Sequence, residues 1–377
     1  MNKQLLAILI VIVAILFTRV APAGASQCTI HRVPNARDLR IDAFYSGVSI
    51  AANDVWAVGS AANFKAKETL AEHWDGTSWT IVPTPNYEAN KYGPNLYGVA
   101  AISSANVWAV GDYFDLTQGA YSTLALHWNG KRWALVLPPN PGQDALLQGV
   151  TGIGKSNALW MVGVAGLQSS AFSFIELHDR GSWSVAYATP GYIAGIAALS
   201  QKSAFAVGSY TAPTGSSYPL AVHWNGQTWS QMLTTGLPTG GSFSSVSELS
   251  DGDVWAVGTV SFDRSVRPLV AHWDGVSWTQ VPGPTFHLKY ATLNGVLALS
   301  RSNVWTAGVT YDRRPFQSTN IVAHWTGLAW TTLRAPEPQT FQSLFGISGQ
   351  PHALWSFGRA EDSSGSSGKG VTDLSSC

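Results

Sequence analysis

Short apolar stretches alternate with small polar turns along almost the whole chain, and no helical period of three to four residues persists over a useful length. One apolar stretch, Val55-Trp56-Ala57-Val58-Gly59, returns in six further copies. The aromatic residues of the seven copies stand at positions 56, 108, 160, 205, 255, 305 and 355, so the spacing is about 50 residues. This regular spacing predicts a repeat architecture in which each repeat forms one supersecondary unit.

A second motif, HWDGTSW at His73–Trp79, follows the first by about 20 residues. It recurs at His127–Trp133, His223–Trp229, His272–Trp278 and His324–Trp330, with a degenerate copy at His178–Trp183. Its Asp-Gly or Asn-Gly pair is a strong hairpin signal. A further apolar stretch precedes each VWAVG. Each repeat therefore predicts four antiparallel strands: a (GVxxI), b (VWAVG), c (ending in HW) and d (beginning at the last Trp).

These units predict an all-β fold, a seven-bladed β-propeller of four-stranded antiparallel blades. The seventh repeat lacks HWDGxxW, whereas Cys28–Pro34 resembles Trp79–Pro83. We therefore expect the N-terminal segment to close the ring as strand d of the last blade, with Val371–Cys377 as its strand c. The expected domain covers residues 26–377, with blades near 44–86, 96–140, 147–190, 193–237, 243–284, 293–336 and 343–377 plus 28–34.

The two cysteines, Cys28 and Cys377, lie at opposite ends of this domain. Closure of the ring would bring them together, and in an oxidising compartment they are candidates for a disulfide. Residues 1–25 have the pattern of a cleaved signal peptide, with one Lys, an apolar run from Leu5 to Phe17 and Ala-Gly-Ala at the end. The expected location is thus secreted or extracytoplasmic; an uncleaved N-terminal membrane anchor is the alternative.

The VWAVG and HWDGxxW repeats resemble those of exported bacterial β-propellers, which are broadly kelch-like. They are also similar in style to tryptophan-rich repeat lectins and to the Asp-box blades of sialidases. The resemblance covers nearly the whole chain after residue 25 and implies a propeller scaffold. Because one fold carries many functions, the resemblance does not define a ligand.

All 17 tryptophans belong to the repeats. We expect them to fill the space between blades, although a set of equivalent sugar-stacking platforms is an alternative. Six histidines, at 73, 127, 178, 223, 272 and 324, share one position of the repeat and are expected to be structural hydrogen-bonding residues. The sequence has no recognisable metal-binding or cofactor-binding motif, so neither a metal nor a cofactor is predicted.

Non-repeating aromatic and ionisable residues concentrate in the b–c and d–a loops, which share one face of a propeller. Glu248 differs because it lies in strand a, where we expect it to line the central channel. The candidate ligand-binding residues are Tyr92, Asp112, Tyr113, Glu248, Asp263, Arg264, Tyr290, Tyr311, Asp312 and Arg313. No catalytic residue is assigned.

Lys+Arg and Asp+Glu are equal at 22 each, so nothing in the composition favours a nucleic-acid partner. Beyond the signal segment, no stretch of sequence predicts membrane insertion. The expected function is non-enzymatic recognition of a glycan or a cell-surface protein through the b–c/d–a face, by a monomer. The alternatives are a carbohydrate-active hydrolase or lyase that uses carboxylates of the same face, and a structural surface module.

Overall fold

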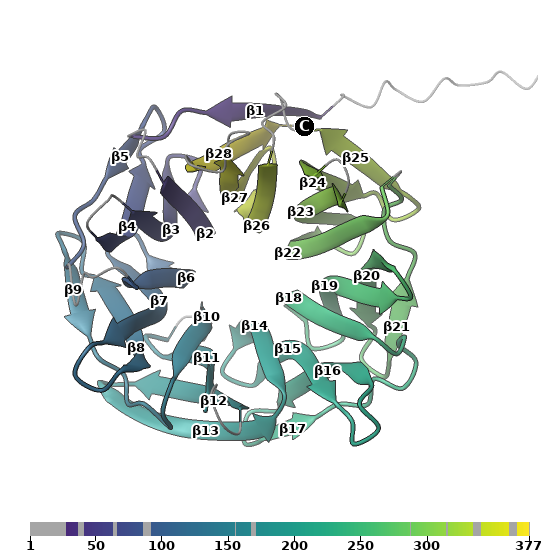
Figure 1. Cartoon of the computed structure of the whole chain (residues 1–377), viewed down its shortest axis with the longest axis horizontal. Helices are drawn as coiled ribbons and strands as arrows, with labels where there is room; N and C mark the ends of the chain where they lie inside the picture. The colour runs from purple at the N-terminus through teal and green to yellow at the C-terminus, as the bar shows by residue number, and fades with distance from the viewer. Residues whose placement is uncertain are drawn as a thin grey trace, which may run out of the picture.

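A computed structural model describes residues 28–36, 41–62, 66–85, 92–154, 156–166, 171–286, 288–313, 316–334, 341–361 and 368–376. These residues form 28 strands, and the chain is an all-β propeller (Figure 1). We call the four strands a to d of one sequence repeat a repeat unit. The residues predicted as a signal peptide lie outside the described residues.

Each of the first four repeat units follows the predicted strand order. The first contains β2 (Ile41–Ala51), β3 (Asp54–Ala62), β4 (Lys67–Trp74) and β5 (Trp79–Ile81). The second contains β6 (Asn95–Ser103), β7 (Asn106–Asp115), β8 (Ala120–Trp128) and β9 (Trp133–Val136). The third contains β10 (Leu146–Gly152), β11 (Leu159–Ala165), β12 (Phe172–Asp179) and β13 (Ser182–Pro190). The fourth contains β14 (Tyr192–Ser200), β15 (Ser203–Thr211), β16 (Ser217–Trp224) and β17 (Trp229–Gln231).

The remaining units complete the ring. The fifth contains β18 (Gly241–Ser250), β19 (Asp253–Phe262), β20 (Ser265–Trp273) and β21 (Trp278–Val281). The sixth contains β22 (Tyr290–Ser300), β23 (Asn303–Arg313), β24 (Phe316–Trp325) and β25 (Trp330–Arg334). The last contains β26 (Phe341–Gln350), β27 (Ala353–Glu361), β28 (Gly368–Ser376) and the N-terminal β1 (Thr29–Val33). In Figure 1, each strand a lies nearest the centre.

The predicted seven separate blades are not observed. Counted as hydrogen-bonded sheets, the propeller has five blades, because two of the sheets are eight-stranded and three are four-stranded. Each eight-stranded sheet joins two repeat units through one parallel residue pair, Ile41 with Gly368 or Val266 with Tyr290. At the second junction the Val266 amide also donates to the carbonyl of Lys289, the residue directly ahead of β22, at 3.2 Å, and this bond holds the start of β22 beside β20. Within each unit the ladders are antiparallel.

The N-terminal strand joins the last unit, as the sequence predicts. β1 pairs with β28 in an antiparallel ladder that runs from Thr29–Ser376 to Val33–Thr372. The register differs from the expected alignment, because Ile30, not Cys28, takes the place that Trp79 has in the first unit. No cysteine among the described residues is free, but Cys377 lies outside them. The Cys28–Cys377 pairing therefore stays a prediction.

The hydrophobic core lies between neighbouring repeat units. Trp56 of the first unit packs against Trp128 and Trp133 of the second, with ring centroids 5.0 and 5.2 Å apart. The same packing crosses the point of ring closure, where Trp355 lies 5.1 Å from Trp74. Large buried aromatic rings of this kind dominate core energetics. No described segment forms a helix of the length and hydrophobicity needed to cross a membrane.

Candidate functional site

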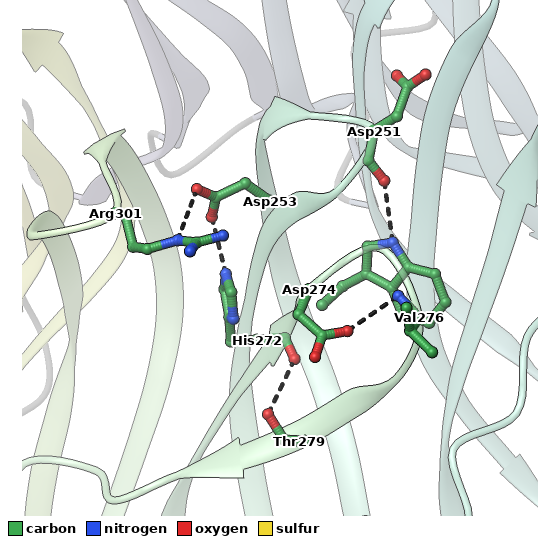
Figure 2. Close-up of polar contacts among 8 residues, drawn as sticks. Asp251, Asp253, His272, Asp274, Val276, Thr279 and Arg301 are labelled. Atoms are coloured by element: carbon green, nitrogen blue, oxygen red, sulfur yellow. Dashed lines mark hydrogen bonds and ion pairs between the residues drawn. The ribbon is translucent and has the colours of Figure 1, made fainter.

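The repeated histidines and aspartates are structural, as Figure 2 shows for the fifth unit. The Asp253 carboxylate lies 2.8 Å from Nε2 of His272 and 3.2 Å from Nε of Arg301. Asp274 of HWDG accepts from the backbone amide of Val276 at 2.9 Å and thereby holds the c–d turn. Gly275 has φ +94°, a left-handed conformation that glycine adopts without strain. These contacts recur with Asp or Asn in other units, so they belong to the scaffold.

The tryptophans are also structural. Those of strand b are nearly fully buried, with Trp56 only 2% exposed. The HW tryptophans donate their Nε1 hydrogens to carbonyl oxygens of the a–b turn, as Trp74 does to Ala52 at 3.2 Å. Because the rings face neighbouring units, they do not form a set of exposed sugar platforms.

His178 does not share the position of the other five repeated histidines. It lies opposite Leu159, whereas in the first unit the residue opposite the matching Val55 is Trp74. Its ring lies 4.9 Å from Trp108 of the preceding unit, in the manner of a tryptophan at that site. The sequence comparison assigned it wrongly because the third unit lacks the Trp that follows His elsewhere.

Glu248 is not among the residues that line the cavity of about 170 Å³ at the centre of the strands a, contrary to expectation. Its carboxylate accepts hydrogen bonds from the Ser203 hydroxyl at 2.6 Å and from the Leu199 amide at 3.2 Å, both in the preceding unit. Ser203 stands where other units carry the Asp or Asn that contacts the repeated histidine. Burial raises the pKa of Glu248 to about 7. Its surroundings therefore indicate a role in packing two units together.

Asp112 lies in a polar network on the b–c/d–a face, between the first and second units. The carboxylate is only 2% exposed and accepts a hydrogen bond from Nδ2 of Asn95 at 2.9 Å. Lys67, the first residue of β4, donates in turn to Oδ1 of Asn95. Burial raises the pKa of Asp112 to about 6, although Asn95 and Lys67 both oppose the rise. Burial also lowers the pKa of Lys67. Perturbed pairs of this kind are typical of binding and catalytic sites.

Aromatic rings flank this network. Tyr92 lies 4.8 Å from Phe114, which contacts Tyr121 at 5.1 Å, so the three form a continuous aromatic row. Tyr92 is 44% exposed and thus accessible to a ligand. Tyr113, another predicted site residue, is buried in the core between the first and second units. Sequence reasoning did not identify Lys67 or Asn95.

The other predicted residues lie in the fifth and sixth units and form no single cluster with Asp112 among the described contacts. Asp263 and Arg264 are exposed in the turn between β19 and β20. Tyr290 stacks on Tyr311 with ring centroids 5.1 Å apart, and Tyr290 is buried. Asp312 is half-buried near the end of β23. The side chain of Arg313 lies outside the described part of the chain.

The largest departure from the sequence-based site is a ring of residues around the central cavity. In every repeat, the ladder between strands a and b shifts by one residue at the same place, which leaves one residue of strand a as a β-bulge. The bulge residues are Tyr45, Tyr97, Gln148, Ala194, Ser244, Asn294 and Phe345. All seven line one cavity of about 170 Å³. We call them the bulge ring.

A sequence signal for the bulge ring exists. The bulge residue directly precedes a position that is always Gly or Ser, as in Tyr97-Gly98 and Asn294-Gly295. The identity of the bulge residue varies while its neighbours repeat, which is the pattern expected of a functional position on a repeated scaffold. Among the described residues, no three His, Cys, Asp or Glu side chains are grouped so that they could hold a metal ion.

Comparisons with known proteins support the fold alone. No known protein family matches the sequence, and no curated protein matches it. Among solved structures, the chain is similar to YCF48 bound to a D1 peptide, with TM-score 0.51, 14% identity and coverage of 93% of this chain and 97% of that one. It is also similar to a PL25 ulvan lyase bound to -[GlcA(1-4)Rha3S]-, with TM-score 0.58, 8% identity and coverage of 88% and 94%. A third similar structure is the GH74 xyloglucanase of Xanthomonas campestris, with TM-score 0.57, 12% identity and coverage of 89% of this chain and 54% of the xyloglucanase. The class that these findings define is the β-propeller with repeated blades.

Proposed function

We propose that the protein is a recognition module that binds a glycan or a peptide on the b–c/d–a face, beside the network of Lys67, Asn95 and Asp112. This network is the main support for the proposal. In it, Asn95 connects the buried carboxylate of Asp112 to the partly buried ammonium of Lys67, between the first and second units. A scaffold position would repeat around the ring. At the strand position of Asp112, however, the neighbouring units have Ser60 and Val164.

The arrangement can donate and accept hydrogen bonds at one site. Lys67 and the Asn95 amide supply donors, Asp112 supplies acceptors, and the exposed Tyr92 offers an aromatic face. Ligand pockets typically combine apolar surface with a few converging polar groups. The structural neighbours named above were solved with a peptide in one case and a polysaccharide fragment in another, so the fold accommodates both classes of ligand.

A carbohydrate-active hydrolase or lyase is the second candidate function. The observation that favours it is the raised pKa of Asp112, about 6, because carboxyls with such values act as general acids or bases near neutral pH. Asp112 would be the proton-transfer residue at such a site. Cleavage of a bound saccharide would establish this function.

The test is binding of the purified protein to a glycan array and a peptide array, with cleavage followed in the same wells. Asp112→Asn keeps the shape and removes the charge, and we expect it to weaken binding of the best ligand at least tenfold. Asp179→Asn is the matched control, because Asp179 is an exposed acid at the end of β12 and is not one of the candidate ligand-binding residues. Loss of binding in the control with retention in Asp112→Asn would contradict the proposed site. Absence of any ligand would favour a structural surface module.

A further inference from the structure

The bulges depend on the last glycine of VWAVG, which is present in all seven repeats. The last glycine of each VWAVG lies opposite the residue just before the bulge, as Gly111 lies opposite Leu96. A Cβ on Gly111 would overlap the carbonyl oxygen of Asn95, and the equivalent glycines meet the equivalent carbonyls. Strand a can therefore approach strand b closely enough to form the bulge only because glycine stands there. A β-bulge re-aims a side chain, which here places one residue of each unit at the cavity.

Close packing beyond the bulge keeps this cavity narrow. The position after the bulge is Gly or Ser in every unit, and a Cβ on Gly98 would lie 2.9 Å from Cα of Gly149 in the next unit. The cavity is lined by these small residues, by the bulge residues and by Val or Ile residues two positions after several of the bulges. Among the lining positions, the bulge residues differ most in size and polarity from unit to unit.

The bulge ring is chemically two-sided. Phe345, Tyr45 and Tyr97 come from the last, first and second units and form an aromatic arc, with ring centroids 5.4 and 5.3 Å apart. The rest of the ring is small or polar. Its two amides, Gln148 and Asn294, flank this arc along the chain of units.

The aromatic arc lies in the same sector as the charged residues of the b–c/d–a face. Lys67 belongs to the first unit and Asp112 to the second, and Arg359 of the last unit stands at the strand position of Asp112. Burial, followed by the charge of Asp112, raises the pKa of Tyr97, so its hydroxyl stays protonated. Two independent asymmetries, one aromatic and one ionic, thus coincide in three consecutive units.

We infer that the bulge ring binds one neutral pyranose residue, which stacks on the arc of Phe345, Tyr45 and Tyr97 and hydrogen-bonds to the amides of Gln148 and Asn294. The inference goes beyond the proposed function, because the bulge ring is a second group of residues, separate from the network of Lys67, Asn95 and Asp112. A pyranose has an apolar face of C–H groups, which aromatic rings bind, and a rim of hydroxyls, which amides bind. The inferred ligand is neutral because none of the seven bulge residues has a charged side chain.

The amides have capacity left for a ligand. Asn294 donates through Nδ2 to the Leu344 carbonyl at 2.7 Å, which fixes the side chain and leaves its carbonyl oxygen as an acceptor. Gln148, on the other flank of the arc, lines the same cavity. Pre-ordered polar groups of this kind lower the entropic cost of binding a sugar.

The experiment is saturation-transfer NMR with three probes: neutral methyl pyranosides, methyl glucuronide, and a tripeptide ending in phenylalanine. Tyr45→Leu removes the central ring of the arc, and we expect at least a tenfold loss of affinity for the best neutral pyranoside. Tyr97→Phe keeps the ring and removes only the hydroxyl, so it should cost less than Tyr45→Leu. Phe262→Leu, which changes an exposed aromatic residue outside the bulge ring, is the matched control and should bind as the native protein does. Melting temperatures of all variants verify folding.

The outcomes separate the two proposals. Equal pyranoside binding by Tyr45→Leu and the native protein would overturn the inference, as would exclusive binding of the glucuronide or of the peptide. If Tyr45→Leu retains array ligands that Asp112→Asn loses, the proposed function stands and the pyranose site falls. If neither the variants nor the native protein bind any ligand on this face, the proposed function and the pyranose site are both wrong.

Discussion

Glu176 should make the protein less stable as the pH rises, and Glu176→Gln should remove that effect. The side chain is fully buried in β12, and neither carboxylate oxygen has a hydrogen-bond partner among the described residues. Burial alone raises its pKa from 4.5 to about 7. A carboxyl with a raised pKa in the folded state favours folding below its unfolded pKa, and this contribution is lost as pH rises through the folded pKa.

The size of the effect follows from the two pKa values. A difference of about 2.5 between folded and unfolded states corresponds to about 3 kcal/mol when the pH is above both. Most of this loss falls between pH 5 and pH 8, where we expect the native protein to lose about 2–3 kcal/mol through Glu176. Glutamine has nearly the same shape and no charge, so Glu176→Gln should be more stable than the native protein at pH 8 and similar at pH 5.

The assay is urea unfolding at pH 5 and pH 8, followed by tryptophan fluorescence and checked for reversibility. The difference between variant and native protein is the relevant quantity, because Glu248 and Asp112 also have raised pKa values and contribute to the pH dependence of both. Parallel stability curves for the two proteins would refute the reasoning, since they would show that Glu176 does not titrate in this range.

Asp373 provides a comparison, because burial raises its pKa as well, whereas the charge of Arg32 opposes the rise. It occupies the same strand position in the last unit, opposite the third residue of its VWAVG copy, and it is equally buried. Unlike Glu176, it has a partner, because Nε of Arg32 lies 2.9 Å from its carboxylate. Asp373→Asn should therefore destabilise the protein, by about 1–3 kcal/mol, because it leaves a partly buried guanidinium without its charge partner.

Three further changes test the scaffold. Mass spectrometry of peptides from non-reduced protein should find Cys28 joined to Cys377, and reduction should lower stability by about 2–5 kcal/mol; two alkylatable thiols in the native protein would exclude the bond. Gly111→Ala should cost about 1–3 kcal/mol in urea unfolding, because its Cβ would overlap the Asn95 carbonyl, and an unchanged stability would show that the bulge relaxes freely. Asp253→Ala removes the carboxylate that contacts both His272 and Arg301 in Figure 2 and should lower the free energy of unfolding by about 1–3 kcal/mol, whereas an unchanged stability would show that these two contacts are dispensable.

The propeller and its closure could be predicted from sequence because local and long-range signals agree. VWAVG and HWDGxxW mark strands and turns within each repeat, and the misplaced strand d at Cys28–Pro34 shows where the ring closes. The count of separate sheets could not be predicted. It depends on single parallel pairs such as Val266–Tyr290, which arise from how the loop before β22 folds back. No periodicity in the sequence encodes that loop geometry.

The ligand-binding site predicted from sequence stays a prediction, but the structure changes the surroundings expected for some of its residues. Glu248 was placed at the channel because strand a lines it, but its contact with Ser203 compensates for an Asp or Asn missing from the preceding unit. A contact of this kind, between residues of two different units, cannot be predicted from one repeat alone. Asp112 was correctly placed on the b–c/d–a face, whereas its partner Lys67 was overlooked because an isolated lysine at the start of a strand has no distinctive pattern.

The bulge ring shows why repeats can hide a site. Because the glycine of VWAVG is invariant, it was counted as part of the scaffold, yet its steric effect is what turns one residue per unit toward the cavity. The invariant glycine thus determines where the variable bulge residue points, because it allows the backbone of strand a to form the bulge. In a repeat protein of this kind, an alignment of the repeats should therefore be searched for variable positions beside invariant glycines. Here the search would have found Tyr45, Tyr97 and Phe345 together, and their grouping in consecutive units is the feature that distinguishes one side of the ring.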